Sequence, residues 1–331
     1  MKKFRLLPVL VLGFVLLICS GWGFYVHRTT HQLALNLLPA NPGKFFYAHR
    51  QYLIRESVRP DQRRNTDSTE AKKHYIDLEP FGDSAAYRLP RDPAVAWKEN
   101  RALLEEYGSL PYEVLTMKNR LTNAMRSLQT DSILFLAADL GHYIGDAHVP
   151  LHTTINYDGQ LSGQKGIHAL WESLVPESDL RKYSLKPAGR AKYLSDPAET
   201  IWEVIRHAHS LLPEMLEAER AVSRNFPDSV KFMMVKRGDR TLRYYTPEFI
   251  RAYAPEVRAM VNDQLLRSSG CIANFWYTCW IDAGKPNLNA LVSRDAVLKQ
   301  QRKREKRSFR KDQLLKDSLL DAQKFLSTAI Q

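Results

Sequence analysis

Cysteine is scarce in this chain of 331 residues, which contains only Cys19, Cys271 and Cys279. Cys271 and Cys279 are eight positions apart in a segment with helical periodicity, so a rise of about 1.5 Å per residue separates them by roughly 12 Å. A disulfide needs Cα atoms within about 7 Å of each other. The sequence therefore offers neither a disulfide framework nor a thiolate metal site, and any metal ion must be bound by nitrogen and oxygen.

Strand-like alternation, internal repeats and low-complexity linkers are also scarce or absent, and no glycine-rich stretch matches a phosphate-binding loop such as GxxxxGKS. Apolar residues instead recur three and four positions apart, which predicts helices. The expected helices span residues 112–128, 131–149, 199–223, 247–266 and 272–282, with prolines 111, 150, 197 and 286 at helix edges and polar loops at 64–73 and 157–166. We expect an all-α fold, with a single compact multi-helix domain over residues 22–290.

The first 21 residues have the pattern of a secretory signal peptide. Lys2, Lys3 and Arg5 precede an apolar run over residues 6–19, and the small residues Ser20 and Gly21 follow. Crossing a bilayer takes roughly 20 apolar residues, so a permanent membrane helix is the weaker interpretation, although an uncleaved anchor stays open. We expect a periplasmic or secreted protein, with membrane association as an option.

The formal net charge is +12, and residues 302–311, RKREKRSFRK, are strongly basic. We expect residues 291–331 to form a basic, helical C-terminal tail. Such a tail can bind an anionic membrane surface or nucleic acid, while a solvated helix end explains it equally well. Nothing in the sequence points to an obligate protein partner.

The stretch LGHYIGDAHVPLH, residues 140–152, places ligating groups in an apolar run. His142 and Asp146 are four positions apart and share one face of a helix. Pro150 is expected to end that helix, so that His152 turns back toward the same face. This arrangement suggests a buried site rather than a solvated surface.

Further candidates repeat the pattern. His168 and Glu172 are again four positions apart, and the other candidates are His27, His31, Asp61, His74 and Asp77. Any one of them could be a satisfied core histidine or half of a salt bridge. Together they favour a metal site, because a buried carboxylate without a cation costs several kcal/mol. Imidazole and carboxylate groups are the ligands that zinc takes in a site without cysteine.

The remaining histidines are weaker candidates for metal ligands. His31 and His148 are expected to orient ligands rather than to bind metal. His49, His207 and His209 are expected to be ordinary core or surface residues.

The full set resembles the superfamily that joins bacterial zinc-dependent phospholipase C with the single-strand-specific zinc nucleases. The resemblance runs through Trp22, Asp61, HYID (74–77), GHYIGDAHVPLH (141–152) and HALWE (168–172), in the family's order and close to its spacing, and covers roughly residues 22–285. It implies an all-α phosphodiesterase with a cluster of three zinc ions.

The resemblance also implies a ligand set for each ion. The first set is Asp61, His74, His142 and Asp146. The second is His27, the shared carboxylate of Asp146, and the amino and carbonyl groups of Trp22, whose free α-amine requires signal cleavage just before it. The third is His152, His168 and Glu172. Asp61 is also implied as the catalytic residue, acting as general base or orienting the nucleophile.

The substrate is less clearly indicated. Glu172 and the stretch FWYTCWIDAGKPNLN (275–289) resemble the phospholipase C branch, whereas Tyr75 and Asp77 resemble the pair with which nucleases stack on a base and bind its edge. We expect a zinc-dependent hydrolase of phosphodiester bonds that is phospholipase C-like by sequence, with the substrate open between phospholipid and single-stranded nucleic acid or nucleotides. The alternatives are an exported single-strand-specific nuclease or 3′-nucleotidase acting on single-stranded nucleic acid or nucleotides, and a non-catalytic, zinc-stabilised envelope-binding protein.

Overall fold

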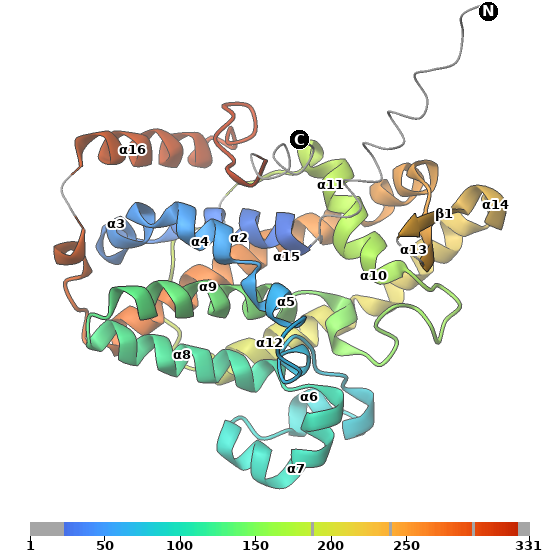
Figure 1. The fold of residues 1–331 in the computed structure, drawn as a ribbon, viewed down its shortest axis with the longest axis horizontal. Coiled ribbons are helices and arrows are strands. Elements are labelled where there is room, and N and C mark those ends of the chain that lie inside the picture. The colour runs from blue at the N-terminus through green and yellow to red at the C-terminus, as the bar shows by residue number, and fades with distance from the viewer. Residues whose placement is uncertain (1–22, 187–188, 238–239, 293–294, 324–331) are drawn as a thin grey trace, which may run out of the picture.

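The computed structural model describes residues 23–186, 189–237, 240–292 and 295–323 (Figure 1). The expected signal peptide and Trp22 lie outside these ranges. The helices and strands are α2 (Gly23–Leu37), α3 (Ala40–Ala48), α4 (Arg50–Glu56), α5 (Arg59–Arg63), η1 (Ala71–Lys73), η2 (Glu79–Phe81), α6 (Ala85–Arg88), α7 (Pro93–Tyr107), α8 (Leu110–Arg126), α9 (Thr130–Ala147), η3 (Pro150–Thr153), α10 (Ile167–Ala169), η4 (Leu170–Leu174), α11 (Val175–Asp179), η5 (Leu180–Lys182), α12 (Pro197–Ser210), α13 (Leu212–Ser223), α14 (Asp228–Lys231), β1 (Phe232–Arg237), β2 (Arg240–Tyr245), α15 (Pro247–Asp282), η6 (Leu288–Leu291) and α16 (Ala296–Arg310).

The fold is helical, as the periodicity predicts, and its core lies where α15 packs against α2, α8 and α9. Phe275 and Trp276 of α15 are completely buried there. The Trp276 indole donates a hydrogen bond to the carbonyl of Ala137 in α9, at 3.0 Å. Cys271 and Cys279, also on α15, are buried free thiols. Among the described helices, none has both the length and the apolar character of a membrane span.

Helices α8 and α9 match the expected ranges to within two residues, but two other segments differ. Residues 199–223 form two helices, α12 and α13, because Pro213 in the first turn of α13 cannot continue a preceding helix. Conversely, α15 is one helix of 36 residues instead of the two expected. Its buried face continues past Gly270, so tertiary packing overrides the weak helix propensity of glycine.

An antiparallel pair of strands, β1 and β2, interrupts the helical pattern and was not predicted from the sequence. Phe232 pairs with Tyr245 at the open end, and their ring centroids lie 4.9 Å apart. Each strand has only six residues, so its alternation was too short to stand out in the sequence.

The basic segment forms helix α16, which packs against α2. Its Glu305 is buried and accepts hydrogen bonds from the side chains of Gln32 (3.0 Å), Asn36 (2.7 Å) and Tyr47 (2.7 Å). One carboxylate thus ties α16 to α2 and α3. Figure 1 shows α16 lying along these N-terminal helices. The domain boundary near residue 290 stays a prediction.

We predict that Glu305→Ala lowers the free energy of unfolding by about 2–4 kcal/mol, because the Tyr47 hydroxyl loses its acceptor and the side-chain amides of Gln32 and Asn36 each lose one of two acceptors. Glu305→Gln should cost less, since its amide oxygen still accepts. Chemical denaturation followed by circular dichroism measures both. Glu99→Ala, at an exposed position of α7, is the control and should stay within about 0.5 kcal/mol of the wild type. Equal stability of Glu305→Ala and this control contradicts the anchoring role.

Candidate metal centre

Helix α9 carries His142 and Asp146 into the core on one face, with Nε2 of His142 lying 3.3 Å from Oδ2 of Asp146. The helix ends at Ala147, and Pro150 opens the short turn η3 that brings His152 back. All three side chains are buried. The local fold is thus the one that the spacing and the proline predict.

A first group of ligating atoms forms around Asp146. Its Oδ2 lies 2.9 Å from Nδ1 of His74, and its Oδ1 lies 3.2 Å from Nε2 of His27. Asp61, from α5, places Oδ1 3.6 Å from Nδ1 of His74 and 3.8 Å from Nε2 of His142. The structure therefore brings five of the candidate ligands together, and the two oxygens of Asp146 face different histidines.

A second group consists of His152, His168 and Glu172. Oε2 of Glu172 lies 2.5 Å from Nε2 of His168 and 3.5 Å from Nε2 of His152. Glu172 sits in η4, a π-helical turn that continues α10. The two groups adjoin, since ligand atoms of His27, Asp146 and Glu172 all lie within 4.8 Å of one another.

Backbone carbonyls fix the orientation of three imidazole rings. Nδ1 of His142 lies 2.8 Å from the carbonyl of Ser57, Nδ1 of His168 lies 3.0 Å from that of Tyr157, and Nδ1 of His152 contacts that of His74. A carbonyl only accepts, so each Nδ1 carries the proton and donates. In the neutral imidazole each Nε2 is then an acceptor directed into the cluster, which is how metal-binding histidines are held.

This orientation brings acceptor atoms close together, and their arrangement shows whether a metal ion fits between them. Nε2 of His152 and Nε2 of His168 are only 3.2 Å apart, and both face the carboxylate of Glu172. Three acceptors therefore converge with no donor among them. A cation or an added proton between them removes the repulsion. The nitrogen and oxygen donor set suits a divalent metal such as zinc, so the residues present fit a bound metal ion.

Electrostatics at the first group also favour positive charge. Burial alone would lower the pKa of His142, but Asp146 and Asp61 raise it to about 9. Burial would likewise raise the pKa of Asp146, yet the facing histidines, His142 foremost, hold it well below its usual range. The cluster thus stabilises a cation, whether a proton or a metal ion.

Glu70 is a supporting residue that the sequence analysis missed. It is fully buried, and its Oε1 lies 3.6 Å from Nε2 of His74. Arg63 donates to Glu70 at 2.8 Å and to Asp139 at 3.1 Å, and the Tyr143 hydroxyl also donates to Glu70. This network places the negative charge of Glu70 beside His74, which lies outside the longer helices and whose Nδ1 faces Asp146. The only signal in the sequence was the four-residue spacing of Glu70 and His74.

Two glycines of α9 provide the room for the helix that carries His27. A Cβ atom on Gly145 would lie 2.7 Å from Nδ1 of His27, and one on Gly141 would lie 2.3 Å from Nε2 of His31. Nδ1 of His31 lies 2.7 Å from the carbonyl oxygen of His27, and its Nε2 lies 3.1 Å from that of Ala138. Because burial lowers the pKa of His31 to about 3, the ring is neutral and only one of the two nitrogens donates. It therefore supports the position of His27 and is not among the grouped ligand atoms.

The other candidates lie outside the metal-binding groups of the described residues. Asp77 is buried, and burial together with the nearby Glu79 raises its pKa to about 7. Tyr75 is half-buried, with its hydroxyl 3.4 Å from the carbonyl of Glu106. Nδ1 of His148 contacts the carbonyl of Ile144 at 2.7 Å, so this ring is held by its own helix.

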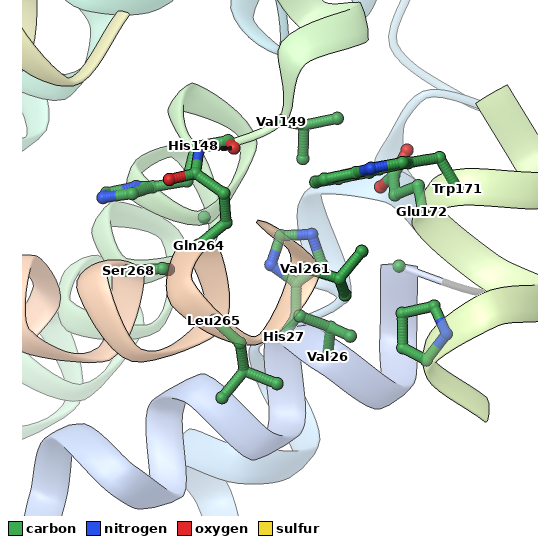
Figure 2. A pocket seen from close by; sticks show the side chains of 13 residues that line it. Val26, His27, His148, Val149, Trp171, Glu172, Val261, Gln264, Leu265 and Ser268 are labelled. Carbon is green, nitrogen blue, oxygen red and sulfur yellow. Dashed lines mark hydrogen bonds between the residues drawn. The ribbon is translucent and has the colours of Figure 1, made fainter. Parts of the chain in front are cut away.

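A pocket adjoins the metal-binding groups (Figure 2). His27 and Glu172 line it, and so do the apolar side chains of Val26, Val149, Trp171, Val261 and Leu265. In Figure 2 the Trp171 ring lies next to Glu172, across the pocket from Gln264 and His148. Apolar surface thus lies directly beside candidate ligands.

Two alpha-toxins are among the solved structures that align with this chain. Alpha toxin from Clostridium absonum aligns with a TM-score of 0.47 and 13% identity over 82% of this chain and 66% of the toxin. Clostridium perfringens alpha-toxin, isolated from the avian strain SWCP, aligns with a TM-score of 0.48 and 12% identity over 81% of this chain and 65% of the toxin. This chain thus spans slightly less than two thirds of either toxin.

No protein-family model matches the sequence, and no curated protein matches it. Similarity to the toxins at this level assigns no activity. The fold and the cluster define the class of this protein only as an all-α protein with buried histidine and carboxylate groups that could hold metal ions.

We predict that Gly145→Ala displaces His27 and lowers the bound metal measured by mass spectrometry on the purified protein. The new methyl group would sit within 3 Å of the imidazole. The His27 ring is buried and stacked on that of His142, with centroids 4.0 Å apart, so it has little room to move.

Gly270→Ala in α15 is the matched control, because nothing lies within 4 Å of its Cβ position. It should keep the full metal content and gain about 0.5–1 kcal/mol of stability from the higher helix propensity of alanine. Unchanged metal content in Gly145→Ala contradicts the close packing of α9 on α2.

Proposed function

We propose that the protein is an exported, zinc-dependent hydrolase of phosphodiester bonds, phospholipase C-like in its specificity. The observation that carries the proposal is the convergence of imidazole and carboxylate acceptors in two adjoining groups with no donor between His152, His168 and Glu172. Zinc ions bound there would lower the pKa of water toward about 7 and withdraw charge from phosphate oxygens.

The proposed ligand sets follow the two groups. Asp61, His74, His142 and Asp146 would hold one ion, and His152, His168 and Glu172 another. His27 and the second oxygen of Asp146 would hold a third ion, together with the amino and carbonyl groups of Trp22 after signal cleavage. In support, a Cβ on Gly23 would lie 3.2 Å from the ring of His27 and 3.3 Å from Asp61, so the chain entering α2 runs against two of these ligands.

The solvent side of the cluster is suited to an anionic substrate. Asp61 is the most accessible carboxylate of the first group, with 25% of its side chain exposed. Arg64, more exposed still, has Nη1 3.6 Å from Oδ1 of Asp61. A phosphodiester approaching here would meet the guanidinium, which pairs well with phosphate oxygens, while Asp61 could accept a proton from water.

We rank a phospholipid above a nucleotide because Glu172 and the stretch over residues 275–289 resemble the phospholipase C branch. The apolar pocket beside His27 and Glu172 has a volume of about 40 Å³, which is too small for an acyl chain, so it does not contribute to this ranking.

We predict that treatment with a zinc chelator abolishes hydrolysis of bis(p-nitrophenyl) phosphate and that added Zn²⁺ restores it, because the ligand set favours zinc over oxygen-preferring Mg²⁺. Phosphatidylcholine and single-stranded DNA, assayed in parallel on the mature protein, separate the two substrate classes. A zinc-loaded protein that is inert on all three contradicts the enzymatic proposal and favours the non-catalytic alternative.

We predict that Asp61→Asn lowers kcat on the model phosphodiester by about 10²–10⁴-fold, the range for loss of general-base catalysis. Metal content must be measured on the same preparation, so that loss of a ligand and loss of a base can be told apart. Asp83→Asn, at an exposed position, is the matched control and should keep full turnover. Full turnover with full metal content in Asp61→Asn excludes the proposed role.

A further inference from the structure

A polar cavity of about 280 Å³, distinct from the apolar pocket beside His27, lies between α16, the end of α2 and the start of α3. Four cationic side chains line it: Arg190, Arg302, Lys306 and Arg310. The other lining residues are apolar apart from Asn36, and no acidic residue is among those that the structure describes around it. No proposed metal ligand lines this cavity, so it is separate from the metal centre.

Geometry gathers these charges on one side of α16. Residues 302, 306 and 310 are four positions apart and share one helix face. Arg190 approaches from the segment before α12 and lines the same cavity. On the α16 face toward α2, Glu305 accepts its three hydrogen bonds and fixes the helix in place. The basic face is therefore held in position rather than free to spread into solvent.

The four cations have little compensation within the described part of the chain. Nζ of Lys306 donates to the carbonyl of Leu38 at 2.9 Å, but no ion pair links any of the four to a carboxylate among the described residues. Nε and Nη2 of Arg302 are buried and have no hydrogen-bond partner. Other partly buried arginines do have partners, as Arg63 has Glu70 and Asp139.

The cost of this arrangement is visible at Lys306. Burial, together with the positive charges of Arg302, Arg310 and Arg190, lowers its pKa to about 8. The position of Arg302 is tightly packed, because a Cβ on Gly43 would lie only 2.7 Å from its Nη2. The chain thus holds like charges together where a solvated helix end would let them separate.

We propose that this cavity, defined by Arg190, Arg302, Lys306 and Arg310, binds a phosphate group. A phosphate dianion offers several acceptor oxygens to guanidinium and ammonium donors and balances at least two of the charges. One water occupies about 30 Å³ of liquid, so the cavity has room for phosphate and for a small organic group attached to it. The phosphate is either free in solution or the exposed phosphate of a lipid headgroup.

The test uses the full mature protein with its metal bound. Thermal unfolding is followed with increasing inorganic phosphate, against chloride at equal ionic strength. Flotation with phosphatidylcholine vesicles, with and without phosphatidic acid, tests the headgroup. Arg302→Gln and Lys306→Gln each remove one donor, and Arg307→Gln and Lys303→Gln are matched controls at exposed positions of α16 outside the cavity.

The expected result is binding to phosphate, to phosphatidic acid vesicles or to both, weakened about tenfold or more by either cavity variant and unchanged in the controls. Without ligand, the cavity variants should be at least as stable as the wild type, because they relieve repulsion.

Equal weakening by the controls shows a diffuse basic surface and overturns the proposal. The absence of any binding also overturns the proposal. So does binding that is unchanged in both cavity variants, because that result would place the phosphate at the metal centre instead. None of these outcomes bears on the proposals of zinc binding and phosphodiester hydrolysis, because the cavity contains no proposed metal ligand.

Discussion

Repulsion between acceptor atoms in the core is the constraint on which the rest of this structure depends. His152, His168 and Glu172 face one another with lone pairs, and Asp146 is a buried carboxylate among three imidazoles. Such an arrangement is stable only with positive charge at its centre. The Nδ1 contacts with backbone carbonyls prevent the rings from turning away. Binding of a metal ion here would therefore be coupled to the packing of this core, because a site that brings together α2, α5, α9 and the segment from η3 to η4 does not exist in the unfolded chain.

The surrounding elements position the ligands by several different means. Gly141 and Gly145 let α2 approach α9 closely, so that the ring of His27 stacks on that of His142 with centroids 4.0 Å apart. His74 has no long helix to hold it; its Nδ1 faces Asp146, and Glu70, whose charge Arg63 and Tyr143 stabilise, lies 3.6 Å from its Nε2. The regular helices thus supply ligands through packing, whereas the irregular segment needs a buried polar network.

The limits of prediction from the sequence follow from the same physics. Helices α8 and α9 were located well because their apolar periodicity is strong, and Pro150 correctly marked the turn that returns His152. The break at Pro213 was overlooked, while α15 runs on through Gly270 because packing along its buried face outweighs local propensity. Spacing alone paired His142 with Asp146 and His168 with Glu172, whereas the grouping of His152 with His168 and Glu172 was implied by the resemblance. Glu70 and the two glycines of α9 could not be predicted, since their roles exist only after distant segments pack together.

The electrostatic layout of α2 joins the two charged regions in one physical scheme. A helix carries partial positive charge at its N-terminus and partial negative charge at its C-terminus. The chain enters α2 at Gly23, against Asp61, and His27 of the first turns lies beside Asp146, so acidic groups cluster at the positive end. At the other end, the carbonyl of Leu38 accepts from Lys306, and the basic cavity surrounds it. Each end of α2 therefore lies near side chains whose charge is opposite to its own partial charge. The carboxylates at the N-terminal end and the cationic side chains at the C-terminal end each exceed the partial charge of the helix. Excess negative charge favours a cation in the buried cluster, and excess positive charge favours an anion in the cavity next to α16.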